Sequence, residues 1–190
     1  MEILKERILS EGKILEGNIL QVSSFLNHLV DTRLLHQTGK ALAAVFADCR
    51  PTKIITIETS GVPFAAFCAL ELQIPFIIAK KLKSLNLSDD VYTSEVFSFT
   101  TQVMYNMRVS KDCINQNDKI LIIDDFLASG KGVKGLMSII RQANATLVGV
   151  GICIEKTFLQ GAAELIRQGV NLHSLVRIAS IENNTITFLP

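Results

Sequence analysis

Two adjacent carboxylates follow the most apolar run of the chain. Residues 120–133 read ILIIDDFLASGKGV, so Asp124 and Asp125 end an aliphatic stretch and precede a loop of small residues. A helix is expected from residue 131, and the first backbone N–H groups of a helix are unpaired and partly positive. Small residues ahead of such a helix let a phosphate approach the backbone closely. The residues of this expected phosphate loop are Ala128, Ser129, Gly130, Lys131 and Gly132.

The two acids would repel a phosphate, so they are expected to face sugar hydroxyls, a metal ion or a developing positive charge. A Walker A loop is excluded because Asp125 stands at its first glycine position and Gly132 follows Lys131. A dinucleotide-binding fingerprint does not fit, since the comparable pair, Gly149 and Gly151, lies within an expected strand. A lone acid would suggest simple helix capping. Two acids before a glycine-rich helix entry favour a functional site.

Two further polar segments follow expected strands at 53–57 and 75–79. The first is a turn and the second is a lysine run. Each segment also has a purely structural interpretation, because a turn can cap a helix and a lysine run can be a solvent-exposed edge. The segments consist of Glu58, Thr59, Ser60 and Gly61 in the first case, and of Lys80, Lys81 and Lys83 in the second.

Strands and helices alternate through most of the chain, which predicts an α/β fold: a parallel sheet flanked by helices on both faces, with ligands at the carboxyl ends of the strands. We expect residues 1–190 to form a single domain. Residues 13–30 read as irregular and, like the C-terminal part, fit the alternation poorly, so we expect both to form a small hood over the carboxyl edge. Residues 81–110 are irregular and favour an antiparallel flap. Helices are expected at 2–11, 31–48, 62–72, 131–143 and 160–168, and strands at 53–57, 75–79, 120–125, 146–155, 172–181 and 185–189.

Composition narrows the classes of function. The chain has 190 residues, of which 48% are hydrophobic, and a net charge of +1, so it has no global basic surplus for nucleic acid. The N-terminus is charged and amphipathic rather than a signal peptide, and the apolar runs are too short to span a membrane, so a cytoplasmic location is expected. Cys68 and Cys153 lie in apolar runs and read as core residues, and no disulfide framework is expected. The three histidines show no metal-ligand spacing.

A hydrophobic run, two acids, two apolar residues and then small residues resemble the phosphoribosyl-diphosphate motif of type I phosphoribosyltransferases. Phe126 and Gly132 depart slightly from that motif, since many members have a hydroxylated residue in place of Gly132. Within the family, the chain is most similar to the bacterial xanthine phosphoribosyltransferases over nearly its whole length. That resemblance includes the segments ILQVSSFLNH (19–28), IETSG (57–61), KSLNL (83–87), IIDDFLASG (122–130) and IEKTF (154–158).

The resemblance implies roles for individual residues. The acids, Asp124 and Asp125, would be catalytic, and the 128–132 loop would hold the 5′-phosphate. The 58–61 turn and a lysine, for which we favour Lys81, would contact the diphosphate. Residues of about 82–108 would form a mobile loop over the substrates. The base would be contacted by Leu20, Asn27, Lys156 and Phe158. Without the resemblance, these four read as core, turn or surface residues.

The implied reaction transfers the 5-phosphoribosyl group from phosphoribosyl diphosphate to xanthine, giving xanthosine 5′-monophosphate and diphosphate. Mg²⁺ is expected to bind mainly through phosphoribosyl diphosphate, without direct protein ligands, and a homodimer is expected. The alternatives are a guanine/hypoxanthine or adenine phosphoribosyltransferase and, from another class, a phosphoribosyl-diphosphate-sensing transcription regulator. The regulator is disfavoured because the net charge is near zero and few residues precede the helix expected from residue 31.

Overall fold

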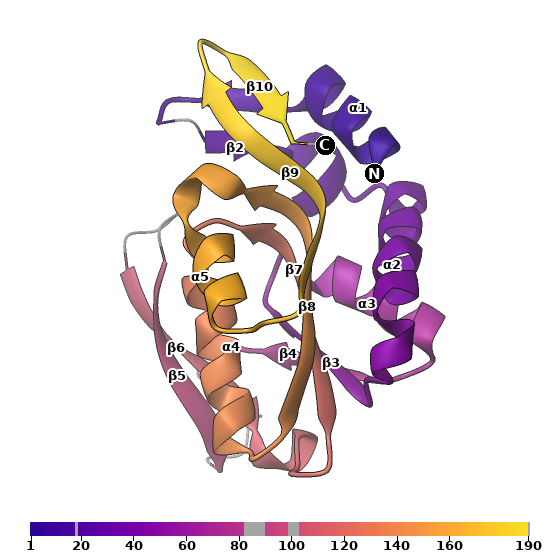
Figure 1. The fold of residues 1–190 in the computed structure, drawn as a ribbon, viewed down its shortest axis with the longest axis vertical. Coiled ribbons are helices and arrows are strands. Elements are labelled where there is room, and N and C mark those ends of the chain that lie inside the picture. The colour runs from indigo at the N-terminus through magenta and orange to yellow at the C-terminus, as the bar shows by residue number, and fades with distance from the viewer. Residues whose placement is uncertain (18, 82–89, 99–102, 190) are drawn as a thin grey trace.

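A computed structural model describes residues 1–17, 19–81, 90–98 and 103–189. Its centre is a sheet with the strand order β10-β9-β8-β7-β3-β4, in which all neighbours are parallel except the antiparallel pair β9–β10 (Figure 1). The predicted α/β fold with a parallel sheet is therefore confirmed. The strands are β3 (Lys53–Ile57), β4 (Phe76–Ala79), β7 (Lys119–Leu127), β8 (Thr146–Lys156), β9 (Leu172–Glu182) and β10 (Thr185–Phe188).

Helices cover both faces of the sheet, as predicted. One face is covered by α2 (Thr32–Phe46) and α3 (Val62–Leu72), and the other by α4 (Lys131–Gln142) and α5 (Gly161–Arg167) (Figure 1). Asp31 caps α2, because its carboxylate accepts the backbone N–H groups of Arg33 and Leu34, both at 3.1 Å. No described helix has both the length and the apolar character needed to cross a membrane.

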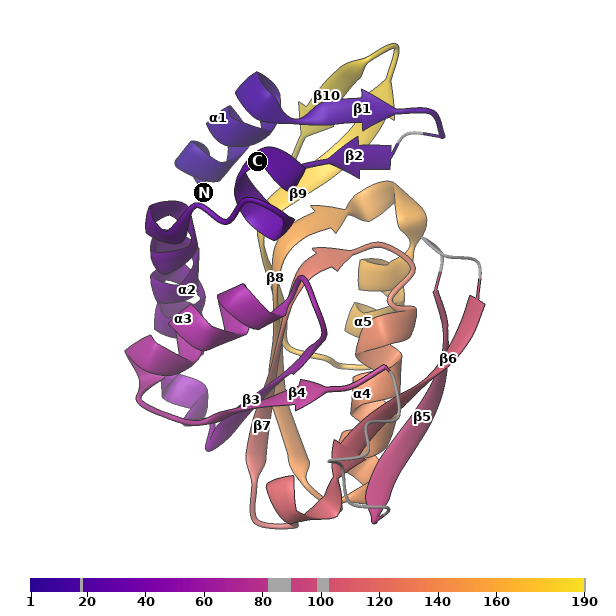
Figure 2. The ribbon, with the colours of Figure 1, turned by 180° about the vertical axis from the view of Figure 1, so that it is seen from behind.

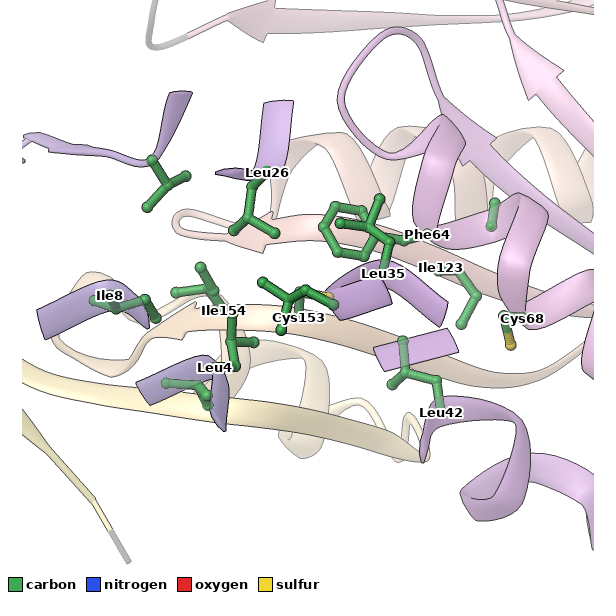
Figure 3. Close-up of a cluster of buried hydrophobic side chains, with 14 of the residues drawn as sticks. Leu4, Ile8, Leu26, Leu35, Leu42, Phe64, Cys68, Ile123, Cys153 and Ile154 are labelled. Carbon is green, nitrogen blue, oxygen red and sulfur yellow. The ribbon is translucent and has the colours of Figure 1, made fainter. Parts of the chain in front are cut away.

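The continuous apolar run of β7 follows from its burial on both faces. Successive side chains of a strand point to opposite faces, so Leu121 and Ile123 join one buried cluster while Ile120 and Ile122 join the other. Figure 3 shows the first cluster, in which Ile123 lies beside Cys68 of α3, and which extends to Leu4 and Ile8 of the N-terminal helix at its other end. Cys68 and Cys153 are both fully buried in it, which confirms them as core residues. All four cysteines are free thiols.

The N-terminal segment gathers above the carboxyl edge of the sheet, beside β10 and the far end of β9 (Figure 2). It comprises α1 (Glu2–Glu11), the hairpin of β1 (Lys13–Leu15) and β2 (Ile19–Gln21), and a π-helical turn (Ser23–Asn27). The reading of residues 13–30 as irregular was therefore wrong. Short strands of this length have too few residues for an alternation to stand out.

Residues after 155 also depart from the expectation. The helix α5 and the strand β9 continue the alternation, because β9 pairs in parallel with β8 over Val150–Lys156. Only the far end of β9 and β10 rise beside the N-terminal segment (Figure 2). The helix and the strand were themselves predicted, at 160–168 and 172–181, but their place in the parallel sheet was not, because strand pairing is decided by packing between distant segments.

The expected flap is present as the antiparallel hairpin of β5 (Val91–Ser98) and β6 (Val103–Ser110). It packs on α4, where a Cβ atom on Gly135 would meet side-chain atoms of Val96 and Met107. Of the predicted mobile loop at about 82–108, residues 82–89 and 99–102 lie outside the described part of the chain, and with them Lys83 and the KSLNL segment. The motion of this loop stays a prediction.

Candidate active site

A pocket of about 240 Å³ lies at the carboxyl ends of β3, β4 and β7. It brings together segments that are distant in sequence: the acids at the end of β7, the loop before α4, the turn after β3, the lysine after β4 and the flap. Every residue predicted from the sequence to bind phosphoribosyl diphosphate lines it. They are Glu58, Thr59, Ser60, Gly61, Lys81, Asp124, Asp125, Ala128, Ser129, Gly130, Lys131 and Gly132.

The acid pair is largely withdrawn from water. Asp124 is 9% exposed, and its Oδ1 accepts the backbone N–H of Asp125 at 3.1 Å. Burial raises the pKa of Asp124 well above its usual value, and the charge of Asp125 raises it further. Burial likewise raises the pKa of Asp125, while the positive charge of Lys81 lowers the pKa of both acids. The pair is therefore suited to meet positive charge, which would offset the penalty of burying two carboxylates.

The phosphate loop has one glycine in a left-handed conformation and lies against the start of α5. Gly130 has φ +73°, in the left-handed region that favours glycine. The N–H of Gly161, the first residue of α5, donates to the carbonyl of Ala128 at 3.2 Å. A Cβ atom on Gly161 would collide with that carbonyl and with the backbone nitrogen of Gly130. Within the described structure no side chain caps α4, so the N–H groups of its first turn can donate to an anion in the pocket.

The turn after β3 is organised by Glu58. Its carboxylate accepts the backbone N–H of Lys81 and lies 3.5 Å from the ammonium of Lys80. The side chain of Glu58 thus ties the end of β3 to the end of β4. The Glu58–Thr59 peptide bond is cis. Gly61 lies directly against Asp124, because a Cβ atom there would be 2.5 Å from Asp124 Oδ1.

The four predicted base-contacting residues do not line this pocket. Leu20 is 6% exposed and belongs to the hydrophobic core, where it reads as a packing residue. Asn27 is exposed at the end of the π-helical turn. Lys156 is half-buried at the end of β8, and this burial lowers the pKa of its ammonium. Phe158 is 38% exposed in the turn after β8.

Tyr105 and Gly161 are among the contributors to the site that sequence reasoning missed. Tyr105 lines the pocket, and its ring centroid lies 5.4 Å from Lys81 Nζ. The sequence did indicate that Tyr105 faces inward. Residues 105, 107 and 109 lie on one face of β6, and Met107 and Val109 on that face are apolar and buried. Gly161 supports the phosphate loop from α5, and no local pattern pointed to that long-range contact.

The side chains that the structure describes do not form a cluster that could bind a metal ion directly. No group of three or more His, Cys, Asp or Glu side chains in the described part of the chain is arranged to hold a metal ion. The acid pair nevertheless fits a substrate that brings its own Mg²⁺, because Mg²⁺ prefers oxygen ligands and keeps bound waters that can donate to carboxylates.

Comparison with known proteins agrees with this geometry. Residues 32–165 match the family model of the phosphoribosyl transferase domain. The chain is 48% identical over 189 residues to a xanthine phosphoribosyltransferase of Bacillus cereus, covering 100% of this chain and 96% of that protein. It is 47% identical, with the same coverage, to one from Bacillus mycoides.

Solved structures show the same fold. The adenine phosphoribosyltransferase of Thermoanaerobacter pseudethanolicus superimposes with a TM-score of 0.77 over 93% of this chain and 98% of that one, at 20% identity. That of Rhodothermus marinus gives a TM-score of 0.76 over 93% and 99%, at 21% identity. Since family match, full-length relatives and fold all agree, the chain belongs to the type I phosphoribosyltransferase family.

Proposed function

We propose that this protein transfers the 5-phosphoribosyl group of phosphoribosyl diphosphate to xanthine, giving xanthosine 5′-monophosphate and diphosphate. The observation that carries the proposal is the 48% identity over the full chain to a protein named xanthine phosphoribosyltransferase. The structural neighbours named for adenine are only 20% and 21% identical and support the fold alone.

In the proposed reaction, the bond from C1 of the ribose to the diphosphate oxygen breaks, and a ring nitrogen of the base forms a bond to C1 and gives up its proton to the solvent. The ribosyl centre is positive when the first bond is largely broken and the second is not yet formed. Asp124 and Asp125 are assigned to hold the ribose hydroxyls and stabilise that charge from a water-poor pocket floor. Two preorganised carboxylates are more effective there than water, because they need not reorient as the charge develops.

The remaining pocket residues are assigned to the two phosphate groups. The 128–132 loop and the first turn of α4 would bind the 5′-phosphate through backbone N–H groups, helped by Ser129 and Lys131. The turn at 58–61 and the ammonium of Lys81 would bind the diphosphate. Mg²⁺, when bound with the substrate, would neutralise the departing diphosphate. We further infer that the protein works in the cytoplasm as a homodimer, as expected from the family.

The decisive experiment measures diphosphate release with phosphoribosyl diphosphate, Mg²⁺ and each of xanthine, guanine, hypoxanthine and adenine. We expect xanthine to give the highest kcat/KM. A chain that preferred adenine would instead act like its structural neighbours. If no base gives turnover and the protein binds DNA at low salt, the proposed enzyme activity is wrong and the transcription-regulator alternative is favoured.

A further inference from the structure

The backbone of Lys81 is fixed where the flap meets the sheet. Just ahead of it, Lys80 exchanges two backbone hydrogen bonds with Arg108 of β6, of 2.9 and 2.8 Å. The N–H of Lys81 itself is bound by the carboxylate of Glu58. The backbone at the end of β4 is therefore bound to β3 on one side and to the flap on the other. These contacts fix the direction of the Cα–Cβ bond of Lys81.

The side chain of Lys81 has two competing partners. Its ammonium lies 5.4 Å from the centroid of the Tyr105 ring, and its charge also acts on Asp124 and Asp125. All four side chains line the same pocket. Burial raises the pKa of the Tyr105 phenol, and the charge of Asp124 raises it further, so the ring stays neutral and offers the ammonium an uncharged partner.

We propose that Tyr105 is a positioning residue that holds the ammonium of Lys81 at the diphosphate end of the pocket and away from the acid pair. This inference rests on the proposed function. A lysine without the ring would be drawn to the carboxylates, where it would neutralise the charge needed beside the ribose and leave the diphosphate without its cation. The ring attracts the ammonium weakly enough to release it to a phosphate.

Direct binding tests this without any base. Titration calorimetry would give Kd for phosphoribosyl diphosphate with Mg²⁺, for diphosphate with Mg²⁺ and for ribose 5-phosphate. The variants are Tyr105→Leu and Tyr105→Phe, each in wild type and in a Lys81→Met background. Since an exposed cation–π contact contributes about 0.5–1 kcal/mol, Tyr105→Leu is expected to weaken binding of both diphosphate ligands about two- to fivefold and to leave ribose 5-phosphate unchanged. Tyr105→Phe keeps the ring and should bind like wild type.

The flap supplies a matched control. Lys111, the residue that follows β6, lies over the ring of Tyr92 of β5 at 5.8 Å, and neither residue lines the pocket. Tyr92→Leu removes a comparable ring and should leave all three Kd values unchanged, so a general loosening of the flap can be recognised.

The outcomes separate the inference from the proposed function. Wild type that fails to bind phosphoribosyl diphosphate would overturn both. If wild type binds but Tyr105→Leu has unchanged affinity for diphosphate, or weakens it equally in the Lys81→Met background, only the positioning role of Tyr105 is overturned. If Tyr105→Leu weakens diphosphate binding when Lys81 is present but not in the Lys81→Met background, the positioning role is established.

Discussion

At the scale of single residues, the acid pair that the proposed reaction needs lowers the stability of the folded protein. Asp124 and Asp125 are adjacent and largely buried, and burial raises the pKa of both. A buried acid that is ionised at neutral pH lowers the stability of the folded chain. Such a cost is expected where the carboxylates serve a ligand rather than the fold.

The Asp124→Asn, Asp125→Asn double variant should show both sides of this conflict. Without charge to stabilise the ribosyl centre, kcat is expected to fall at least about a hundredfold, which corresponds to roughly 3 kcal/mol. The folded structure should persist, because an Asn amide oxygen can still accept the N–H that Asp124 Oδ1 accepts now. Near-normal kcat in the double variant would remove the assigned role.

The same variant makes a prediction about pH. A carboxyl whose pKa is raised on folding binds more protons when folded than when unfolded, so stability falls as pH rises from the usual value of 3.8 through the raised one. Amides do not titrate, so the double variant escapes this loss. Thermal unfolding should give the variant the higher Tm at pH 8, and the difference should shrink toward pH 4. A difference independent of pH would contradict the raised pKa values.

Residues that are contiguous in sequence were the ones that could be predicted. The acids and the small loop stand together in one segment, so strand, turn and helix entry could be inferred from local rules. Tyr105 and Gly161 could not be found in this way, because Tyr105 reaches the pocket from β6 and Gly161 reaches the phosphate loop from α5. Local patterns predict which face a residue lies on, and say nothing of the distant element that this face meets.

At the scale of elements, the phosphate loop depends on the short helix α5. Gly161→Ala would place a methyl group against the carbonyl of Ala128 and the nitrogen of Gly130, so the loop must move. Displacement of binding groups by even about 1 Å can lower activity strongly. We expect KM for phosphoribosyl diphosphate to rise about tenfold with little change in KM for xanthine.

A control on the same helix separates loop movement from helix loss. Ala163 is exposed on α5, and Ala163→Gly removes about 1 kcal/mol of helix stability without adding an atom near the loop. That variant should lower Tm and keep both KM values. If Gly161→Ala also lowers Tm while leaving KM for phosphoribosyl diphosphate unchanged, the contact between α5 and the loop has no part in binding.

The elements themselves were predictable to different degrees. Buried strands such as β7 and amphipathic helices such as α4 have strong periodic or aliphatic patterns, and they were predicted within a few residues. The joining of β9 to the sheet was missed because strand pairing is decided by packing between distant segments.

At the scale of the whole molecule, the proposed base site spans the hood and the sheet. Asn27 ends the π-helical turn of the N-terminal segment, whereas Lys156 ends β8. The segment with Asn27 lies above the carboxyl edge toward which β8 runs (Figure 2). The two groups are anchored in different parts of the fold, so their contributions to base choice should be separable.

The last prediction concerns that choice. Xanthine has oxygens at C2 and C6, so a site built for it needs donors at both edges, which an Asn amide and a Lys ammonium can supply. Adenine has an amine at C6 that would face a group able only to donate, at a loss of roughly 1–3 kcal/mol. Lys156→Ala should therefore lower kcat/KM for xanthine, guanine and hypoxanthine alike, whereas Asn27→Ala should mainly narrow the gap between xanthine and guanine. An Asn27→Ala variant with the wild-type ratio of kcat/KM for xanthine and guanine would refute the role of the hood in selecting the base.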